Sequence, residues 1–544
     1  MDRSLKLFLW CLAAFTVLLL IRNASTPLWD QDEAAYAGMA RNMWESGDWL
    51  TQEFVWAEIH RKPPWHLWAI TFSYQIFGPS EFALRLPSSL ALLGMFSLLW
   101  WGFKRDWGER SLWAAMILAA SFFAPMLGKI ALTDGWLLLW EMLCLLSLWR
   151  TIRDEKSGYW PIWFWVGLAM GILTKGPSII LTAGMACLLV LILHPARRNI
   201  WRLHPWFGLP LALLPLFLWG YIAWQRDDGQ MINWMLDWYI FKRTGGTVLG
   251  QSGPPGYYLG TILVAFLPFV QRLIPALGGL ITGVRRRQAE DLFLLAWLSG
   301  SWLLWELIPS KLPAYAIGAY PVLALLIARQ FEVPVKGLLG HKIGFGIQAV
   351  LSAAVVVGLI GGSYYLWGWM GIIVPILLAI LILGALLGHR FLKTSLLSNE
   401  SQKAWVPIIG GFGFMLILWL GLMPGVSALR EAPIKIQAYL KNAAPANSTI
   451  VLANVQGRPP SLPYYLGETY DSFLEQRDPA TLLGLYVSKR PMALILNKDQ
   501  YQYLQQQQPD LPEAAIFPLF SSDRIEGNAY YVVVNDAART ANRK

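Results

Sequence analysis

The chain has 544 residues, of which 56% are hydrophobic and 14% are charged, and its formal net charge is +10. Soluble domains average about 45–50% apolar and about 25% charged residues, so the composition argues against a soluble globular protein. The basic residues form short clusters between apolar runs, which is a membrane-topology signal and argues against a nucleic-acid-binding surface. All three cysteines (Cys11, Cys144 and Cys187) lie within apolar runs, so neither a disulfide framework nor a Cys-based metal site is expected.

Apolar runs of membrane-spanning length recur along most of the chain. They predict a polytopic α-helical membrane protein with about thirteen spans. The predicted spans are 6–22, 84–103, 110–127, 132–150, 159–174, 177–194, 206–224, 257–279, 290–308, 313–329, 343–365, 367–388 and 405–423. Arg22 and Asn23 follow the first span without a small-x-small cleavage site, so we expect it to remain as an anchor.

The basic clusters also predict the orientation of these spans. Clusters such as Lys104-Arg105 and Arg285-Arg286-Arg287 alternate with loops that are poor in basic residues. The positive-inside rule then places the N-terminus in the cytoplasm. The segment 27–83, the loop 225–256 and the C-terminus are expected to face outward.

The longest polar insertion in the N-terminal half covers residues 29–64. Its acids Asp30, Asp32 and Glu33 precede a helical pattern that ends at a Ser-Gly-Asp sequence at 46–48. The apolar positions of this pattern are Tyr36, Met39, Ala40 and Met43. In one interpretation the helix lies on the membrane surface, apolar face down, with its acids at the mouth of an enclosed site. In the other, Asp30 and Glu33 form a capping box, and the acids only complement the helix dipole.

The character of the sequence changes near residue 425, where Pro, Asn, Gln and charged residues become common. Strand-like runs alternate there with helix-like pieces, which predicts a small α/β domain outside the membrane. The strand-like runs are Thr449–Ala453, Ala493–Leu496 and Tyr530–Val534. We therefore divide the chain into a transmembrane domain, 1–424, with loop helices at 27–83, and an extracytoplasmic domain, 425–544.

Three lysines occur in matching contexts where an apolar span meets the predicted outer surface, each shortly before a proline that fixes the direction of the chain. They lie in Lys62-Pro63-Pro64, Lys175-Gly176-Pro177 and Lys311-Leu312-Pro313. A single interfacial lysine is usually a snorkelling anchor. With Arg243, however, four cations share this face with Asp32, Glu33 and Asp134, which fits phosphate recognition beside acid–base chemistry. A lipid-linked phosphate is the anion that fits this depth.

Seven motifs in fixed order carry a family resemblance. They are Pro27–Ala37, Glu45–Trp49, Lys62–Pro64, Phe82–Pro87, Leu132–Asp134, Leu173–Pro177 and Ser310–Tyr315. This ordered set resembles the bacterial aminoarabinose transferases, which modify lipid A and are relatives of the protein O-mannosyltransferases. The resemblance covers residues 27–330 and implies a GT-C-class glycosyltransferase of the bacterial inner membrane, with a cytoplasmic N-terminus and a periplasmic C-terminal domain.

The resemblance also implies the reaction. A sugar, 4-amino-4-deoxy-L-arabinose in the named family, would pass from undecaprenyl phosphate to an outer-face acceptor such as lipid A or another envelope glycan, with inversion of the anomeric centre. Asp32 would be the catalytic carboxylate, and Asp134 a second acid on the acceptor side. The implied donor- and substrate-binding residues are Glu33, Lys62, Arg85, Lys175, Arg243, Lys311 and Tyr315.

Two positions depart from the family pattern. Arg61 stands where an acidic residue usually precedes Lys-Pro-Pro, and residues 239–242 contain no histidine ahead of Arg243. Because the family associates these positions with a metal ion, the departures argue against a divalent metal here. Glu58 and His60 are the weak candidate ligands. No other cofactor is implied.

Other functions remain open. The chain could be closer to a protein O-mannosyltransferase, or it could transport a lipid or sugar without transferring it. A transporter needs ionisable residues near the bilayer midplane, where Glu141 and Glu306 are the main candidates. The charged residues instead gather at the predicted outer face of the membrane, which favours an enzyme acting there over a transporter. The C-terminal domain could in addition bind a partner.

Overall fold

The structure, a computed structural model, describes residues 3–242, 251–332, 339–380, 382, 404–453, 455, 458–518 and 529–542. The chain divides into two compact units. The helical unit comprises Met1–Asn23, Trp49–Thr51 and Lys62–Leu420. The α/β unit comprises Ala24–Asp48, Gln52–Arg61 and Gly421–Lys544. Most of the N-terminal polar segment therefore belongs to the same compact unit as the C-terminal part of the chain.

The helical unit is built from the apolar runs. Its α-helices are α1 (Arg3–Leu20), α3 (Trp65–Phe77), α4 (Glu81–Trp107), α5 (Glu109–Ala119), α6 (Phe123–Leu127), α7 (Thr133–Arg153), α8 (Trp160–Lys175), α9 (Ser178–Leu193), α10 (Pro205–Asp227), α11 (Gln230–Leu236), α13 (Tyr257–Ala265), α14 (Val270–Arg285), α15 (Ala289–Leu298), α16 (Leu304–Glu306), α17 (Tyr320–Arg329), α18 (Leu339–Trp367) and α20 (Trp405–Ile417). Short 3-10 or π-helical turns join several of them: η2 (Arg197–Leu203), η3 (Asp237–Phe241), η4 (Leu267–Phe269), η5 (Ser299–Leu303), η6 (Pro313–Ala319), η7 (Gln330–Glu332), η8 (Gly368–Ile372) and η10 (Leu418–Leu422).

Six stretches of the described residues are long and apolar enough to cross a membrane. They are Glu81–Trp107, Thr133–Arg153, Pro205–Asp227, Leu267–Arg285, Leu339–Trp367 and Trp405–Ala428. Shorter apolar helices cover Ser4–Leu20, Ser178–Leu193 and Pro313–Arg329. This confirms a multi-pass, mainly helical membrane protein, while the number of spans and their orientation stay predictions.

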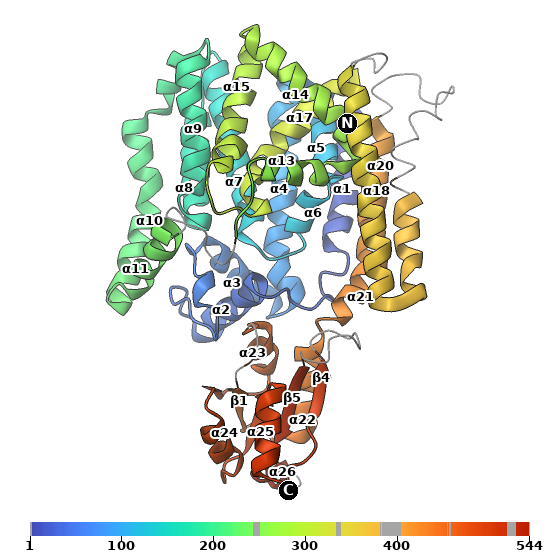
Figure 1. The fold of residues 1–544 in the computed structure, drawn as a ribbon. Helices are drawn as coiled ribbons and strands as arrows, with labels where there is room; N and C mark the ends of the chain where they lie inside the picture. Colours follow the sequence, from blue (N-terminus) through green and yellow to red (C-terminus); the bar gives the residue numbers. More distant parts are fainter. Residues whose placement is uncertain are drawn as a thin grey trace. The chain divides into compact units, whose positions relative to one another are not determined.

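Helix α7 is the most deeply buried of the six long stretches and packs against α4, α8 and α9 (Figure 1). Close packing with α8 depends on Gly167. A Cβ atom added there would lie 3.0 Å from the backbone nitrogen of Cys144 and the backbone oxygen of Trp140. A larger residue would therefore push the two helices apart.

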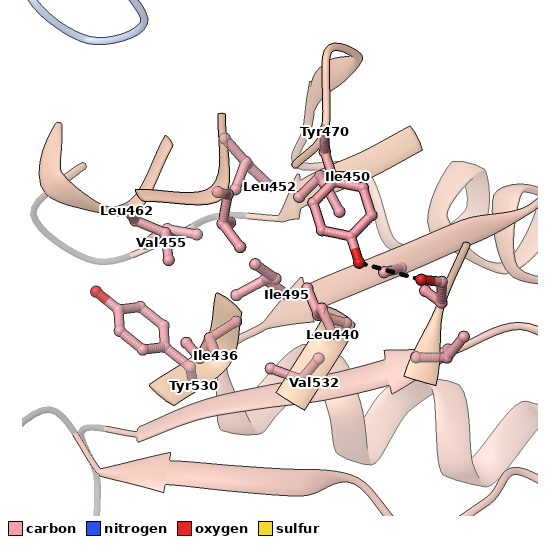
Figure 2. Close-up of a cluster of buried hydrophobic side chains, with 14 of the residues drawn as sticks. Ile436, Leu440, Ile450, Leu452, Val455, Leu462, Tyr470, Ile495, Tyr530 and Val532 are labelled. Carbon is pink, nitrogen blue, oxygen red and sulfur yellow. Dashed lines mark hydrogen bonds between the residues drawn. The ribbon is translucent and has the colours of Figure 1, made fainter. Parts of the chain in front are cut away.

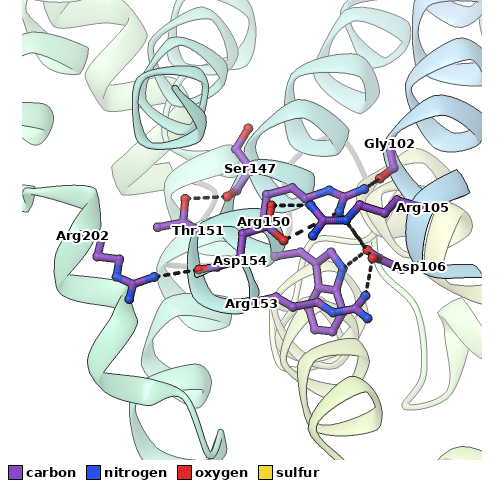
Figure 3. A network of polar contacts seen from close by, with 10 residues as sticks. Gly102, Arg105, Asp106, Ser147, Arg150, Thr151, Arg153, Asp154 and Arg202 are labelled. Atoms are coloured by element: carbon purple, nitrogen blue, oxygen red, sulfur yellow. Dashed lines mark hydrogen bonds and ion pairs between the residues drawn. The ribbon is translucent and has the colours of Figure 1, made fainter. Parts of the chain in front are cut away.

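The C-terminal end of α7 joins its neighbours through a network of arginines and aspartates (Figure 3). The buried carboxylate of Asp106 forms ion pairs with Arg150 at 3.2 Å and Arg153 at 2.5 Å. It also accepts a hydrogen bond from the indole of Trp149 at 3.0 Å. The network extends to Asp154, whose carboxylate pairs with Arg105 at 3.3 Å and, more distantly, with Arg150 at 3.9 Å. It thereby ties the last turn of α7 to α4.

The α/β unit contains a five-stranded sheet with strand order β2-β1-β3-β5-β4. Its strands are β1 (Thr449–Ala453), β2 (Phe473–Gln476), β3 (Met492–Leu496), β4 (Ala515–Pro518) and β5 (Ala529–Val534). Strand β1 pairs in parallel with β2 and β3, whereas β5 is antiparallel to β3 and β4. The three strands predicted from the sequence are confirmed, and the two edge strands β2 and β4 were not predicted.

Helices cover both faces of this sheet. They are α22 (Ala432–Ala443), α23 (Ser461–Leu466) and α26 (Asp536–Asn542), which contribute to one core cluster, and α24 (Pro479–Tyr486) and α25 (Lys498–Gln507), which contribute to the other. Alternate residues of β1 point to opposite faces, so Ile450 and Leu452 enter one core and Val451 the other. Figure 2 shows the first core, in which Tyr470 donates a hydrogen bond to the backbone oxygen of Ala444. The unit also includes η1 (Glu58–His60) and α21 (Met423–Ala428).

The helix predicted after the three acids is α2 (Asp32–Ser46), which ends at Gly47 with φ 70° as expected of a left-handed C-terminal cap. The capping-box interpretation is wrong. Asp30 precedes the helix and accepts hydrogen bonds from Ser461 instead, while Glu33 accepts one from the Trp29 backbone N–H at 2.8 Å. The expectation that the apolar side of α2 faces lipid is also wrong, because protein buries its members Tyr36, Met39, Ala40 and Met43.

Candidate active site

An ion pair joins the start of α7 to the end of α8. Lys175 Nζ lies 2.6 Å from Asp134 Oδ1, with 16% and 9% of the two side chains exposed. Asp134 belongs to the first turn of its helix and Lys175 to the last turn of its own, where each charge complements the helix dipole. Two residues distant in sequence, both predicted to be functional, are therefore brought together.

The structure also brings the Lys62 motif to this pair. A Cβ atom added at Gly176, the residue after Lys175, would lie 4.0 Å from Cγ of Pro63. Gly176 has a φ of +67°, a conformation that suits glycine, so the turn after Lys175 favours glycine at this position. Two of the three lysine–proline motifs consequently lie side by side.

Tyr315 completes this group. Its ring centroid lies 5.3 Å from Lys175 Nζ, in cation–π geometry, and 5.2 Å from the ring of Trp305. We call Lys62, Asp134, Lys175 and Tyr315 the lysine cluster. It combines cationic donors, one carboxylate and an aromatic surface, which is a suitable combination for binding a phosphate ester.

Lys311 is held four residues before Tyr315. Its Nζ donates a hydrogen bond to the backbone oxygen of Glu306 at 2.7 Å and lies 3.4 Å from that residue's carboxylate. Its backbone N–H donates to Gln251 at 3.2 Å, and its ammonium lies 5.3 Å from the ring of Tyr258. The third lysine motif is thus fixed in both its backbone and its side chain.

The Glu306 carboxylate has several partners around Lys311. Besides Lys311, its carboxylate accepts hydrogen bonds from the backbone N–H groups of Gly256 and Tyr258, each at 3.1 Å, and from the Trp302 indole at 3.2 Å. The sequence had indicated Glu306 only as a transporter-type buried acid, and the structure shows it as the partner of a predicted site lysine. Its position five residues before Lys311 was the available signal.

Arg85 lies in a different set of contacts. It is fully buried and donates a hydrogen bond to the backbone oxygen of Asn23 at 2.8 Å, just beyond the C-terminal end of α1. Lys129 binds the same end of that helix through the backbone oxygens of Leu18, Leu19 and Ile21. Carbonyl groups at a helix C-terminus lack partners within the helix, so these two cations cap α1.

Asp32 lies in the α/β unit at the first residue of α2. Its Oδ1 atom lies 2.9 Å from Nδ1 of His60 and 3.4 Å from the hydroxyl of Tyr36. Half of the Asp32 side chain is exposed, whereas Glu33 is buried. A carboxylate that is accessible and oriented by an imidazole suits a role as a general base.

The donor set does not favour a metal. The described part of the chain contains no group of three or more His, Cys, Asp and Glu side chains placed to hold a metal ion. Nδ1 of His60 contacts Asp32, and Glu58 is exposed on η1. The predicted Arg243 lies outside the described residues. No step of the reaction is therefore assigned to a metal.

The predicted residues thus form two groups. Asp32, Glu33, Glu58 and His60 belong to the α/β unit, and Lys62, Arg85, Asp134, Lys175, Lys311 and Tyr315 belong to the helical unit. The first group consists of carboxylates and an imidazole, and the second of cations, one carboxylate and one aromatic ring.

A family model and several named proteins are similar to parts of this chain. A family model described as dolichyl-phosphate-mannose-protein mannosyltransferase matches residues 61–222. The undecaprenyl phosphate-alpha-4-amino-4-deoxy-L-arabinose arabinosyl transferase of Edwardsiella ictaluri is 28% identical over 348 residues. That alignment covers 60% of this chain and 61% of the relative, which is less than two thirds of the relative's length.

Crystal structures of ArnT from Cupriavidus metallidurans share the fold. The apo structure superposes with a TM-score of 0.73 at 20% identity, covering 98% of this chain and 99% of the other. The structure bound to undecaprenyl phosphate gives a TM-score of 0.73 at 19% identity, covering 98% of both chains. The chain therefore has the GT-C fold that the sequence resemblance implied, and the resemblance to aminoarabinose transferases is confirmed.

Proposed function

We propose that this chain is an integral membrane glycosyltransferase that moves a sugar from undecaprenyl phosphate to an extracytoplasmic acceptor. The observation that carries the proposal is the lysine cluster, in which the Lys175–Asp134 pair lies beside the Lys62 motif and the ring of Tyr315. Two lysine motifs that lie side by side, next to one carboxylate and an aromatic ring, fit an anionic ligand. The fold is shared with ArnT, one structure of which is bound to undecaprenyl phosphate, and this supports the same ligand class.

The named relatives support a particular sugar and acceptor. Because the Edwardsiella protein is named for 4-amino-4-deoxy-L-arabinose on undecaprenyl phosphate, we propose this sugar as the first to test. Lipid A is the acceptor that the family resemblance implies. The proposed location is the inner membrane of a bacterium, with the N-terminus cytoplasmic and the α/β unit periplasmic.

The proposed reaction is a single inverting displacement. An acceptor oxygen forms a bond to the anomeric carbon as the bond from that carbon to the phosphate oxygen breaks. Lys62, Lys175 and Lys311 stabilise the negative charge that develops on the departing lipid phosphate. Asp32 takes the proton of an acceptor hydroxyl. Where the acceptor is itself a phosphate, little proton removal is needed and Asp32 orients it.

A pair of matched variants tests this scheme. Asp32→Asn removes the base, and we expect transfer to fall by at least about 10²-fold with normal expression, since general bases contribute about 10²–10⁴-fold. Asp536→Asn is the control, because Asp536 is also the first residue of a helix in the α/β unit and is highly exposed. Transfer is measured in proteoliposomes with a polyprenyl-phosphate sugar. Full turnover by Asp32→Asn would refute the assignment of the base.

A protein O-mannosyltransferase-like reaction is the second candidate, and the family model matched over residues 61–222 favours it. The two reactions differ in the sugar that is transferred and in the acceptor that receives it. Mass spectrometry of lipid A and of envelope glycoproteins, from cells with and without the protein, separates them. A mass difference of an aminopentose on lipid A supports the first reaction, and a hexose on protein supports the second.

A further inference from the structure

The residues immediately before α2 are held by the C-terminal part of the chain. Arg430 donates hydrogen bonds to the backbone oxygens of Pro27 at 3.2 Å and Leu28 at 2.9 Å. Its guanidinium also lies 3.5 Å from the ring centroid of Trp29. One side chain from residue 430 thus fixes three consecutive residues that lead into the helix of Asp32.

A second attachment lies at Asp30, two residues before Asp32. The Asp30 carboxylate accepts hydrogen bonds from the Ser461 backbone N–H at 2.9 Å and hydroxyl at 2.6 Å. Ser461 begins α23, and the Tyr465 hydroxyl of the same helix accepts a hydrogen bond from the Leu28 N–H at 3.1 Å. Hydrogen bonds to a charged acceptor are among the stronger ones in proteins.

Helix α2 itself is attached farther along. Arg41 donates to the backbone oxygen of Tyr464 at 2.8 Å, and its guanidinium lies 3.9 Å from the ring of that residue. It also lies 3.7 Å from the Glu468 carboxylate. The start and the middle of α2 are therefore both anchored to α23 and the residues that follow it.

The partner of Asp32 is attached in the same way. His60 follows Trp56, whose side chain packs in the same core cluster as Ile436 and Leu440 of α22. The Trp56 indole also donates a hydrogen bond to Glu475 at 3.2 Å. Both members of the 2.9 Å Asp32–His60 contact consequently belong to segments that the C-terminal residues hold in place.

We infer that the C-terminal residues 421–544 position the catalytic carboxylate, with Arg430 and Ser461 as the positioning residues that set the direction of Asp32. This inference rests on the proposed function. It assigns to these C-terminal residues a direct effect on turnover instead of an accessory role. These attachments order the segment while the Asp32 carboxylate stays half exposed for the acceptor. Misplacing a reacting group by about 1 Å can cost about 10²-fold in rate.

The test uses the full chain and the variants Arg430→Gln and Ser461→Ala. Each should lower kcat by about 10-fold with little change in the KM for the donor, because the donor-binding lysines are untouched. Ser461→Thr keeps the hydroxyl and should restore most of the rate. Lys435→Gln is the control, because it breaks an exposed ion pair with Glu431 in the same unit.

Hydrogen–deuterium exchange of residues 27–46 gives a readout that does not depend on activity. Faster exchange there in Arg430→Gln and Ser461→Ala, together with the lower kcat, supports the inference. Unchanged exchange, or faster exchange with an unchanged kcat, overturns it. If Arg430→Gln does not fold, Ser461→Ala alone decides. A fully active Asp32→Asn would refute the proposed function separately, whatever the exchange shows.

Discussion

The two ends of helix α7 carry polar clusters of different design. At the C-terminal end, Asp106 contacts two arginines and an indole, and Arg150 is shared between two carboxylates. At the N-terminal end, Asp134 forms an ion pair with Lys175, beside the Lys62 motif. At the C-terminal end, charged groups of α4 and α7 pair with one another and hold the two helices together. At the N-terminal end, Lys175 of α8 and the Lys62 motif lie beside one carboxylate. The comparison predicts that the C-terminal cluster of α7 controls the stability of the protein and that the N-terminal cluster controls its activity.

The largest expected effect is on stability and comes from Arg150→Met. The Arg150 and Asp106 side chains are only 5% and 3% exposed, and removing one partner of a buried pair costs about 3–5 kcal/mol. Thermal unfolding in detergent should show a clearly lower Tm, while the rate per folded molecule stays near the wild-type value. A normal Tm would show that Arg153 alone can neutralise Asp106, and the proposed division between the two ends would fail.

The next effect is on activity and comes from Lys175→Met. Loss of one cation at the departing phosphate should lower kcat on the order of 10²-fold, the cost seen for single donors to a developing anion. The double variant Asp134→Asn with Lys175→Met separates function from structure. If the pair only held α7 to α8, the double variant would recover activity by removing the unpaired carboxylate. We expect it to stay inactive.

Much of the fold could be predicted because it depends on local patterns. The apolar runs predicted the helical unit, and the Ser-Gly-Asp sequence at 46–48 predicted the end of α2 at Gly47. The central strands β1, β3 and β5 are apolar and buried, so their sequences were informative. The edge strands were missed because β2 and β4 are short and largely not buried.

The candidate site was predictable in part. Repeated lysine–proline motifs indicated Lys62 and Lys175, but no local pattern shows that Pro63 approaches Gly176. A helix cap was one of two interpretations for Asp30. Its actual partner, Ser461, is more than 400 residues away in sequence, and local spacing carries no information about such contacts. Trp56 likewise reaches a core made of residues beyond 430. Long-range contacts of this kind require the folded structure.

Glu306→Gln should have a smaller effect on activity than Lys175→Met. The amide keeps the shape of the side chain but loses the charge that attracts Lys311. Because the Glu306 backbone oxygen still accepts the 2.7 Å hydrogen bond from Lys311, we expect only a several-fold higher KM for the donor with a modest change in kcat. Glu290→Gln, which weakens the partly exposed pair with Arg329, is the matched control. Equal effects of the two variants would remove Glu306 from the site.

The smallest expected effect is on stability and comes from Arg105→Gln, in the arginine–aspartate network of Figure 3. Arg105 belongs to the same cluster as Arg150, yet its side chain is 71% exposed and its pair with Asp154 spans 3.3 Å. Exposed ion pairs contribute about 0.2–1 kcal/mol, so Arg105→Gln should change the free energy of unfolding by less than about 1 kcal/mol. The Tm of Arg105→Gln should therefore stay close to that of the wild type, whereas the Tm of Arg150→Met should be well below it. A large loss would mean that the network acts as one cooperative unit whose stability does not follow the burial of its members.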